Sequence, residues 1–334
     1  MRFLRIFRNL ALTAAAAALL MVSAAFATLT PARAETITVT HWGSAFYGAP
    51  YAVAMAKGFF KKRGVDITGI LTSAGGGTSV RNTLAGDLPF GEVALPAALL
   101  AINAGQPIKM ISGGVESVAD ILWITQPDSP FNSIKDLAGK KVAFTSPGSV
   151  TNMLILMCLK AAGMEPKDVK LLPAGDNGAN LAAVLNRAVD AAMNGEPLYS
   201  ENKGKIKPVF WSKDCGTADM TQTVGITTTE FAATGGDKLR AILAARREGV
   251  EYIIKNPDES ADIVAKAYNG DPKLYRDVFK HFVEIKYFGD GRFNFAGMNR
   301  MAEGMQLVGT LKSPPDWKKL IDPQFLPQDL MPTQ

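Results

Sequence analysis

The sequence is poor in the residues and motifs on which most enzymes depend. Histidine occurs only twice in 334 residues, as His41 and His281, which leaves little for a histidine-based metal site or proton relay. No HExxH, GxSxG, P-loop or complete GxGxxG motif is present. The carboxylates are scattered, without a pair whose spacing suggests acid–base catalysis. We therefore expect a protein that is not an enzyme and that holds neither a metal ion nor a cofactor.

Cysteine is equally scarce, with Cys158 and Cys215 as the two residues of this type. Neither belongs to a CxxC motif or to another metal-binding spacing. Cys158 continues the apolar run Met153–Met157, which is typical of a packed helix. We expect two separate thiols and keep a disulfide as the less favoured alternative. A chain of this length can bury an ample core without disulfides.

The N-terminus has the pattern of a secretory leader. Three arginines and no acid stand in residues 1–10, an apolar run follows, and Ala32-Arg33-Ala34 fits the small-x-small pattern that signal peptidase accepts. We predict a signal peptide over residues 1–34 that is cleaved after Ala34. A retained membrane anchor is the alternative, which the marginal length of the alanine-rich run disfavours. Release into the periplasm is the expected destination.

Removal of this leader changes the charge of the protein. The whole chain carries a formal charge of +5, and the leader holds four arginines and no acid, so the mature chain carries +1. A protein that binds nucleic acid usually has a basic stripe, and no such stripe is visible in the sequence. We therefore expect no nucleic-acid partner.

Strand and helix patterns alternate along the mature chain. Such alternation predicts βαβ units around mostly parallel sheets. The expected strands are 36–42, 65–71, 90–95, 108–112, 121–126, 141–144, 169–172, 191–194, 209–212 and 224–228. The expected helices are 50–60, 79–85, 97–104, 133–137, 149–162, 180–188, 237–254, 257–267, 271–282 and 296–308. Two α/β sets and a helical tail are too much for one compact core, so we expect two lobes.

Loops at the ends of the expected strands are the candidate ligand site, because open α/β sheets bind ligands outside the carboxyl ends of their strands. The first loop, His41–Gly48, combines aromatic rings with glycine, which suits a flat or apolar ligand. The alternative is that Trp42 and Phe46 only anchor the loop on the core. From this loop we select Trp42, Gly43, Phe46 and Tyr47 as ligand-binding candidates.

The remaining loops offer backbone N–H groups, hydroxyls and amides. The glycine-rich turn before the helix at 79–85 can be a plain flexible turn or a ligand cradle, and Ser149 can cap a helix while its neighbours bind a carboxylate or sulfonate. The candidates from these loops and from the end of the third strand are Gly76, Gly77, Thr78, Leu95, Pro96, Ser146, Gly148, Ser149, Asn194 and Glu196.

Seven segments of the mature chain carry a resemblance to a known family. They are Gly48–Phe60 (GAPYAVAMAKGFF), Gly76–Thr78 (GGT), Leu84–Gly91 (LAGDLPFG), Pro96–Leu99 (PAAL), Ala104–Lys109 (AGQPIK), Ser133–Ala143 (SIKDLAGKKVA) and Glu196-Pro197. With these segments the mature chain is similar to the substrate-binding proteins of ABC importers, in the branch that includes the sulfonate, taurine and nitrate binders and the NMT1/THI5-like group. The DLAGKKVA block is the most specific of the seven.

This resemblance implies a two-lobed periplasmic-binding-protein fold of type II with a hinge and a helical C-terminal tail. Residues 35–123 and 224–334 would form lobe 1, and residues 124–223 would form lobe 2. A ligand between the lobes would favour the closed form, which a membrane permease then recognises. The family implies a monomer that delivers a small molecule to an ABC permease in the inner membrane.

The residue types in the candidate loops indicate a broad class of ligand. The candidate loops contain aromatics, serine, glycine and asparagine but no arginine, although Arg81 stands one turn into a helix. We expect a planar, aromatic or heterocyclic ligand that is neutral or a monocarboxylate. The alternatives are a sulfonate, taurine or nitrate anion, a secreted enzyme of the pyrimidine-synthesis type, and a ligand sensor for a membrane receptor. The cysteine-rich segment of the enzyme branch is absent.

Overall fold

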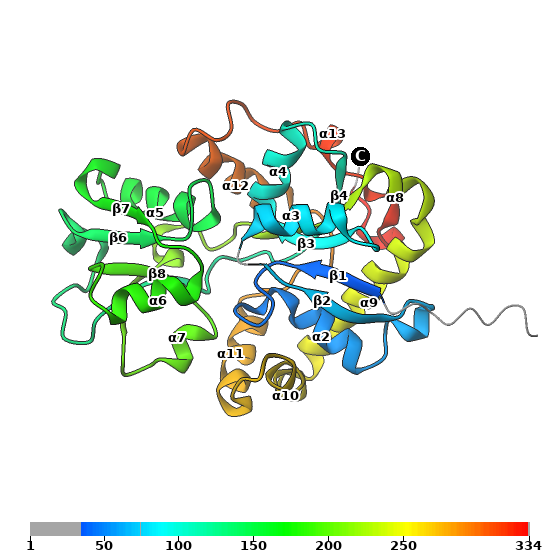
Figure 1. The fold of residues 1–334 in the computed structure, drawn as a ribbon, viewed down its shortest axis with the longest axis horizontal. Helices are drawn as coiled ribbons and strands as arrows, with labels where there is room; N and C mark the ends of the chain where they lie inside the picture. The colour runs from blue at the N-terminus through cyan, green and yellow to red at the C-terminus, as the bar shows by residue number, and fades with distance from the viewer. Residues whose placement is uncertain (1–34, 74, 333–334) are drawn as a thin grey trace, which may run out of the picture. The chain divides into compact units, whose positions relative to one another are not determined.

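Two five-stranded β-sheets carry the part of the chain that the structure describes (Figure 1). The computed structural model describes residues 35–73 and 75–332, so the predicted signal peptide lies outside the described residues. The strand order is β2-β1-β3-β10-β4 in the first sheet and β7-β6-β8-β5-β9 in the second. The first sheet consists of β1 (Glu35–Val39), β2 (Ile67–Leu71), β3 (Phe90–Ala94), β4 (Ile108–Gly113) and β10 (Thr223–Thr228). The second consists of β5 (Ile121–Thr125), β6 (Lys141–Phe144), β7 (Lys170–Pro173), β8 (Ala191–Gly195) and β9 (Lys207–Trp211).

Each sheet is mixed, with one strand opposed to the other four. In the first sheet β10 pairs antiparallel with both β3 and β4, while β1 pairs parallel with β2 and β3. In the second sheet β5 pairs antiparallel with β8 and β9, while β6 pairs parallel with β7 and β8. The two opposed strands are those that follow a crossing from one sheet to the other. The predicted α/β fold with two mostly parallel sheets is confirmed.

Helices cover both faces of the first sheet. In Figure 1, α3 (Gly76–Ala85) and α4 (Leu95–Asn103) lie on one side of it, and α2 (Ala49–Ala56) and α9 (Gly236–Lys255) on the other. α2 ends four residues before the predicted end at Phe60, because Gly58 adopts a left-handed φ of 72°. α9 packs against α2 and contributes Arg246, whose Nε donates to Glu92 of β3 at 2.7 Å.

The second sheet is flanked by α5 (Val150–Ala161), α6 (Asn177–Leu185) and the short α7 (Leu198–Glu201). α6 begins three residues before the predicted start because Asp176 caps it, accepting a hydrogen bond from the N–H of Ala179 at 2.8 Å. On the sheet itself, the ring of Trp123 stacks on Phe210 with 5.0 Å between centroids, and its indole N–H donates to the carbonyl of Ala143.

The C-terminal part is helical, as predicted. α10 (Pro257–Tyr268) packs on α2 and α11 (Pro272–Glu284), whereas α12 (Phe295–Leu307) contacts both α4 and α5 and therefore touches helices of both sheets. A side chain at Gly304 of α12 would lie only 3.2 Å from Cβ of Met153 in α5. Within residues 35–73 and 75–332, every helix is too short or too polar to span a bilayer. The helices of this part are α8 (Thr229–Thr234), α9, α10 (Pro257–Tyr268), α11 (Pro272–Glu284), α12 (Phe295–Leu307) and α13 (Trp317–Leu320).

The two sheets are joined by crossing segments that lie side by side. The chain passes to the second sheet through residues 114–120 and returns through residues 212–222. The two crossings bond to each other, since the N–H of Val118 donates to Ala218 and the N–H of Gln222 donates to Val115. A third segment joins them, because Val115 also pairs with Phe288. The predicted lobe boundaries at residues 123 and 224 stay a prediction. In the structure, β5 starts at Ile121 and belongs to the second sheet.

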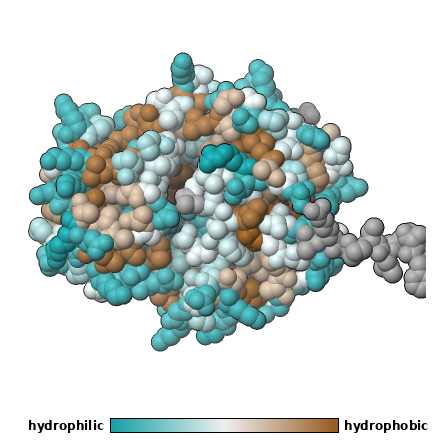
Figure 2. All heavy atoms as spheres, in the orientation of Figure 1, coloured by the Kyte–Doolittle hydropathy of each residue, from teal (hydrophilic) through white to brown (hydrophobic). Residues whose placement is uncertain are grey.

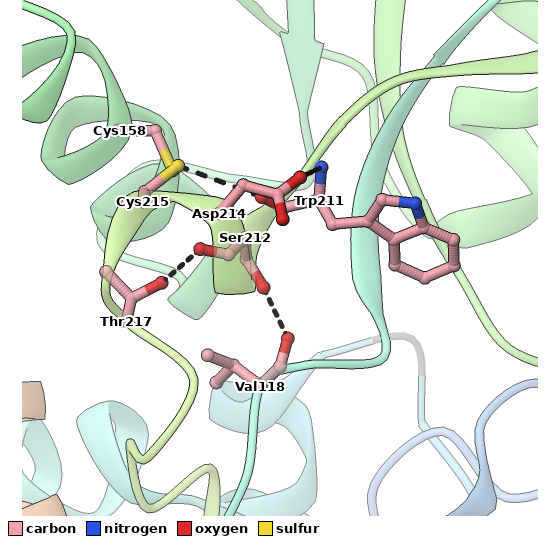
Figure 3. Close-up of a disulfide and its surroundings, with 7 residues drawn as sticks. All are labelled: Val118, Cys158, Trp211, Ser212, Asp214, Cys215 and Thr217. Carbon is pink, nitrogen blue, oxygen red and sulfur yellow. Dashed lines mark hydrogen bonds between the residues drawn. A yellow bond between two sulfur atoms is a disulfide. The ribbon is translucent and has the colours of Figure 1, made fainter. Parts of the chain in front are cut away.

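Cys158 and Cys215 form a disulfide, so the prediction of two separate thiols is wrong (Figure 3). Cys158 is buried in α5, as the apolar run predicts. After β9, however, the 3₁₀ turn η5 (Ser212–Cys215) folds against α5 and brings the two Cα atoms to 5.0 Å. The same turn is tied to the outgoing crossing, because the Ser212 hydroxyl donates to the carbonyl of Val118.

Candidate ligand-binding cavity

A cavity of about 720 Å³ is lined by residues from both sheets. Most of the lining loops follow the carboxyl end of a strand: residues 40–47 follow β1, 75–77 follow β2, 96–97 follow β3, 145–151 follow β6, 177 follows β7 and Gly195 ends β8. The crossings supply Asp120 and Gln222, and β10 supplies its first residue, Thr223. Figure 2 shows the hollow on the viewed face, between the elements that carry these loops. This is the expected position for a ligand in α/β sheets.

Seven of the fourteen predicted ligand-binding residues line this cavity. They come from loops of both sheets, so the fold brings together segments that are far apart in the sequence. These residues are Tyr47, Gly76, Gly77, Pro96, Ser146, Gly148 and Ser149. The other seven lie outside the cavity wall. They are Trp42, Gly43, Phe46, Thr78, Leu95, Asn194 and Glu196.

Phe46 belongs to the core and not to the cavity. Its ring is fully buried and meets the rings of Tyr275, Phe279 and Phe282 edge to face at 4.8, 5.3 and 5.5 Å. The half-buried Trp42 packs edge-on against Tyr268 at 4.9 Å. Phe46 and Trp42 therefore anchor the loop on the core, which is the alternative that the sequence left open.

The other predicted residues outside the wall have structural partners or lie at the surface. Thr78 is exposed and accepts a hydrogen bond from Arg81, and Gly43 is an exposed turn residue with φ of 83°. Leu95 is buried in the core. Asn194 accepts from the N–H of Gly195, which itself lines the cavity. The carboxylate of Glu196 accepts from the Ser200 hydroxyl, and burial raises its pKa to about 7.

Two longer helices point their N-termini at the cavity. α3 starts at Gly76, where a Cβ would come within 2.7 Å of the Ala97 side chain of α4, so only glycine allows this close approach. α5 starts after Ser149, whose hydroxyl accepts from the N–H of Asn152 at 3.2 Å. Ser149 therefore caps the helix and lines the cavity at once. The first N–H groups of both helices lack intrahelical acceptors, which favours a negatively charged or polar ligand group.

A chain of hydrogen bonds forms the polar end of the cavity, and sequence reasoning missed most of it. The Tyr47 hydroxyl donates to Oε1 of Gln222 at 2.6 Å, and Nε2 of Gln222 donates to Oδ1 of Asp120 at 2.8 Å. The second carboxylate oxygen of Asp120 accepts from the Tyr287 hydroxyl at 3.1 Å. Burial raises the pKa of Asp120 to about 7, so this acid is half-protonated near neutral pH.

His41 and Asn177 are lining residues whose side chains form no hydrogen bond within the described part of the chain. Nδ1 of His41 is buried without a hydrogen bond, and burial lowers the pKa of the imidazole to about 4, so the ring is neutral at pH 7. The backbone around His41 is fixed, because its N–H donates to Ser73 and its carbonyl accepts from Ser44 and Ala45. Asn177, at the start of α6, is buried and its amide forms no hydrogen bond to any described residue.

The cavity also has one guanidinium and a large apolar part. Arg81, which the sequence placed one turn into a helix, lines the wall and has one donor committed to Thr78. The apolar wall consists of Val80, Leu84, Ala97, Leu100, Ile121, Val150 and Met193, among others. Within the described residues, no three His, Cys, Asp or Glu side chains are grouped so that they could hold a metal ion. The expected absence of metal and cofactor stays a prediction.

Comparison with known proteins shows the family. The NMT1/THI5 like family model matches residues 45–260. The chain belongs to the NMT1/THI5-like family.

Sequence relatives of this NMT1/THI5-like chain include several named for binding. A Brucella abortus protein named "Putative binding protein" is 27% identical over 83% of this chain and 86% of its own length. The formylaminopyrimidine-binding protein of Halalkalibacterium halodurans is 26% identical over 64% of each chain. The riboflavin-binding protein of Chloroflexus aurantiacus is 24% identical over 84% of this chain and 82% of its own.

Solved structures share the fold of this NMT1/THI5-like protein. The alkanesulfonate-binding protein SsuA of Xanthomonas axonopodis, bound to MOPS, superposes with a TM-score of 0.72 over 88% of this chain and 99% of that chain, at 16% identity. The nitrate-binding protein NrtA of Synechocystis gives a TM-score of 0.65 over 86% and 85% of the two chains, at 18% identity. These likenesses confirm the predicted periplasmic-binding-protein fold.

The residues that sequence reasoning missed in this NMT1/THI5-like chain lie mainly in the crossings. Asp120 and Gln222 stand between expected strands and have no motif around them, so nothing in the sequence marks them. His41 had a signal, because it opens the first strand-end loop. Asn177 follows the expected strand at 169–172, but the predicted helix start at residue 180 placed it in an unassigned turn.

Proposed function

We propose that this chain is a periplasmic solute-binding protein that captures a small organic molecule and delivers it to an ABC importer. The observation that carries this proposal is the convergence of strand-end loops from both sheets on one cavity. A ligand that contacts both walls binds the closed arrangement better than the open one, and so shifts the population towards it. A permease in the inner membrane would then recognise the closed form.

The cavity supports an organic ligand with an acidic group. An apolar wall with two helix N-termini and Arg81 suits a molecule that has a flat apolar body and a carboxylate. Its volume of about 720 Å³ is large for nitrate or sulfate alone. The names of the relatives, which include binders of a formylaminopyrimidine and of riboflavin, fit a heterocyclic body.

A sulfonate is the second candidate, and Arg81 is the observation that favours it. A guanidinium beside two helix N-termini can hold a sulfonate as well as a carboxylate. Enzyme function has less support, because the lining residues offer one neutral imidazole and one buried carboxylate that already accepts two hydrogen bonds.

The test is an unbiased search for a bound solute. The chain from Glu35 onwards would be purified without added ligands and its extract measured by mass spectrometry. The same protein would then be screened by thermal shift against carboxylates, sulfonates, inorganic anions and neutral heterocycles. We expect at least one organic acid to raise Tm and to bind at micromolar Kd, about −8 kcal/mol. Absence of both a co-purified molecule and any stabilising compound would overturn the proposal.

A further inference from the structure

Most polar side chains at the cavity wall already have partners within the protein. The hydroxyl of Thr40 bonds to Ser79, and those of Thr145, Ser149 and Thr151 bond to one another. The Tyr47, Gln222 and Asp120 chain is likewise satisfied. Buried polar groups rarely stay without a partner, because the lost hydrogen bond with water is costly. A lining group without a protein partner is therefore a group that a ligand can satisfy.

His41 and Asn177 are such groups, and they come from opposite walls. His41 follows β1 of the first sheet, and Asn177 starts α6 on the second sheet. Both residues line the same cavity, so one ligand can contact both walls. Three backbone hydrogen bonds fix the main chain at His41, and the ring of Tyr47 meets the imidazole edge to face at 6.0 Å.

The chemistry of this pair defines what it can hold. A neutral imidazole has one donor and one acceptor nitrogen, and a carboxamide likewise offers an N–H donor and a carbonyl acceptor. Neither group carries charge, so they complement an uncharged ligand group and have no special affinity for a carboxylate. A lactam edge, in which a ring N–H stands next to a carbonyl, offers the matching acceptor and donor in one plane.

Resting on the proposed solute-binding function, we propose that His41 and Asn177 are the specificity-determining pair of the cavity and that they hold the lactam edge of a heterocyclic acid between the two walls. The acid group of the same ligand is then held by Arg81 and the N-terminus of α5, which line the same cavity. Selection arises because a ligand without the lactam leaves the buried Nδ1 of His41 unpaired and loses its contact with Asn177.

The test uses a matched pair of probes that differ by one methyl group. 6-Oxo-1,6-dihydropyridine-3-carboxylate has the lactam N–H and the acid, and its N1-methyl derivative keeps the ring, the carbonyl and the acid but lacks the donor. Isothermal titration of residues 35–334 should show that methylation weakens binding at least about tenfold. Benzoate, with the acid but no lactam, should bind as weakly as the methylated probe.

Variants connect this preference to the pair. His41→Phe keeps a ring of similar shape, and Asn177→Leu keeps the volume, and each should remove most of the preference for the unmethylated probe. His281→Phe, on the surface of α11 and outside the cavity wall, is the control that should keep it. Unfolding curves check that each variant folds, and His41→Gln, which retains a donor and an acceptor, should restore part of the preference.

The outcomes separate the two proposals. If the unmethylated probe does not bind, or binds no better than the methylated one, the lactam assignment is overturned, as it is if His41→Phe and Asn177→Leu both keep the preference. In each case the solute-binding function survives so long as other compounds in the broad screen bind. If nothing binds in that screen, the proposed function itself fails.

Discussion

The Tyr47 hydroxyl lies 2.6 Å from Oε1 of Gln222, although 175 positions separate the two residues in the sequence. Tyr47 belongs to the loop after β1, and Gln222 ends the crossing that returns from the second sheet. The amide of Gln222 also donates to the carbonyl of Ser117 and to Asp120 in the outgoing crossing. One tyrosine of the first strand-end loop is thus bonded to the segments that join the two sheets.

Tyr47→Phe tests this link. The variant keeps the aromatic ring in the cavity wall but leaves Oε1 of Gln222 without its donor, so we expect a loss of about 1–3 kcal/mol in the free energy of unfolding. Urea unfolding of residues 35–334 measures it. Tyr252→Phe is the control, because the Tyr252 hydroxyl bonds Glu259 at the surface, and it should cost less than about 0.5 kcal/mol. Equal stability of Tyr47→Phe and the parent would contradict the role of this bond.

Phe46 and Leu100 should respond to truncation in opposite ways. Phe46→Ala removes a fully buried ring from an aromatic cluster, and we expect a loss of about 3–5 kcal/mol in stability, with little change in the affinity for any solute found by the screen. Leu100 lines the cavity and is 36% exposed, so Leu100→Ala should leave stability within about 1 kcal/mol but weaken solute binding. Urea unfolding and solute titration of both variants measure these effects. A binding defect in Phe46→Ala but not in Leu100→Ala would contradict the assignment of Phe46 to the core and Leu100 to the cavity.

Patterns within single elements predicted the fold well. Every expected strand is present, and the β6 boundaries agree with the structure to the residue, because a short apolar run between turn residues marks a strand locally. Boundaries that depend on one capping contact were less accurate, as at α6, where the Asp176 side chain starts the helix early. Which strand runs opposite in each sheet depends on the crossings, and no local pattern encodes that.

The candidate site shows the same limit. Loops that follow strands could be found from the sequence, and they supplied Tyr47, Pro96 and Ser149. Within the first loop, sequence reasoning could not decide which aromatic faces the cavity, because Phe46 is turned to the core by α11, which stands more than 200 residues later. Asp120 and Gln222 gain their positions only when the two crossings pair.

The disulfide should stabilise the protein without shaping the cavity. Cys158 and Cys215 are 57 positions apart, and closing a loop of that length stabilises the folded state by about 4 kcal/mol in the chain-entropy model. Neither residue lines the cavity. We expect the double variant Cys158→Ala/Cys215→Ala to lose about 2–4 kcal/mol in urea unfolding and to keep its affinity for solutes. Dithiothreitol should lower the unfolding free energy of the parent to about that of the double variant and leave the variant unchanged. Equal unfolding free energies of parent and variant without dithiothreitol would show that the disulfide contributes nothing.

Asp120 should make the protein less stable as the pH rises. Burial raises its pKa in the folded chain to about 7, above the usual 3.8, so between these values the folded state holds a proton that the unfolded state has lost. The stabilisation from this group is therefore complete below about pH 4 and is lost as the pH rises through 7. Glu116 and Glu196, whose pKa values burial also raises to about 7, act in the same direction.

Asp120→Asn isolates this contribution. The amide oxygen can still accept from Gln222, and its NH₂ can donate to the Tyr287 hydroxyl, which both accepts and donates. Between pH 5 and pH 8 we expect the parent to lose about 2 kcal/mol more unfolding free energy than the variant, measured by urea unfolding at each pH. Asp128→Asn is the control: Asp128 is exposed and its hydrogen bond with Arg187 lowers its pKa, so it stays ionised throughout this range and the variant should follow the parent. If the parent and Asp120→Asn lose unfolding free energy in parallel, Asp120 is ionised in the folded protein over the whole pH range. The polar end of the cavity then carries a fixed negative charge, which would repel an acidic ligand.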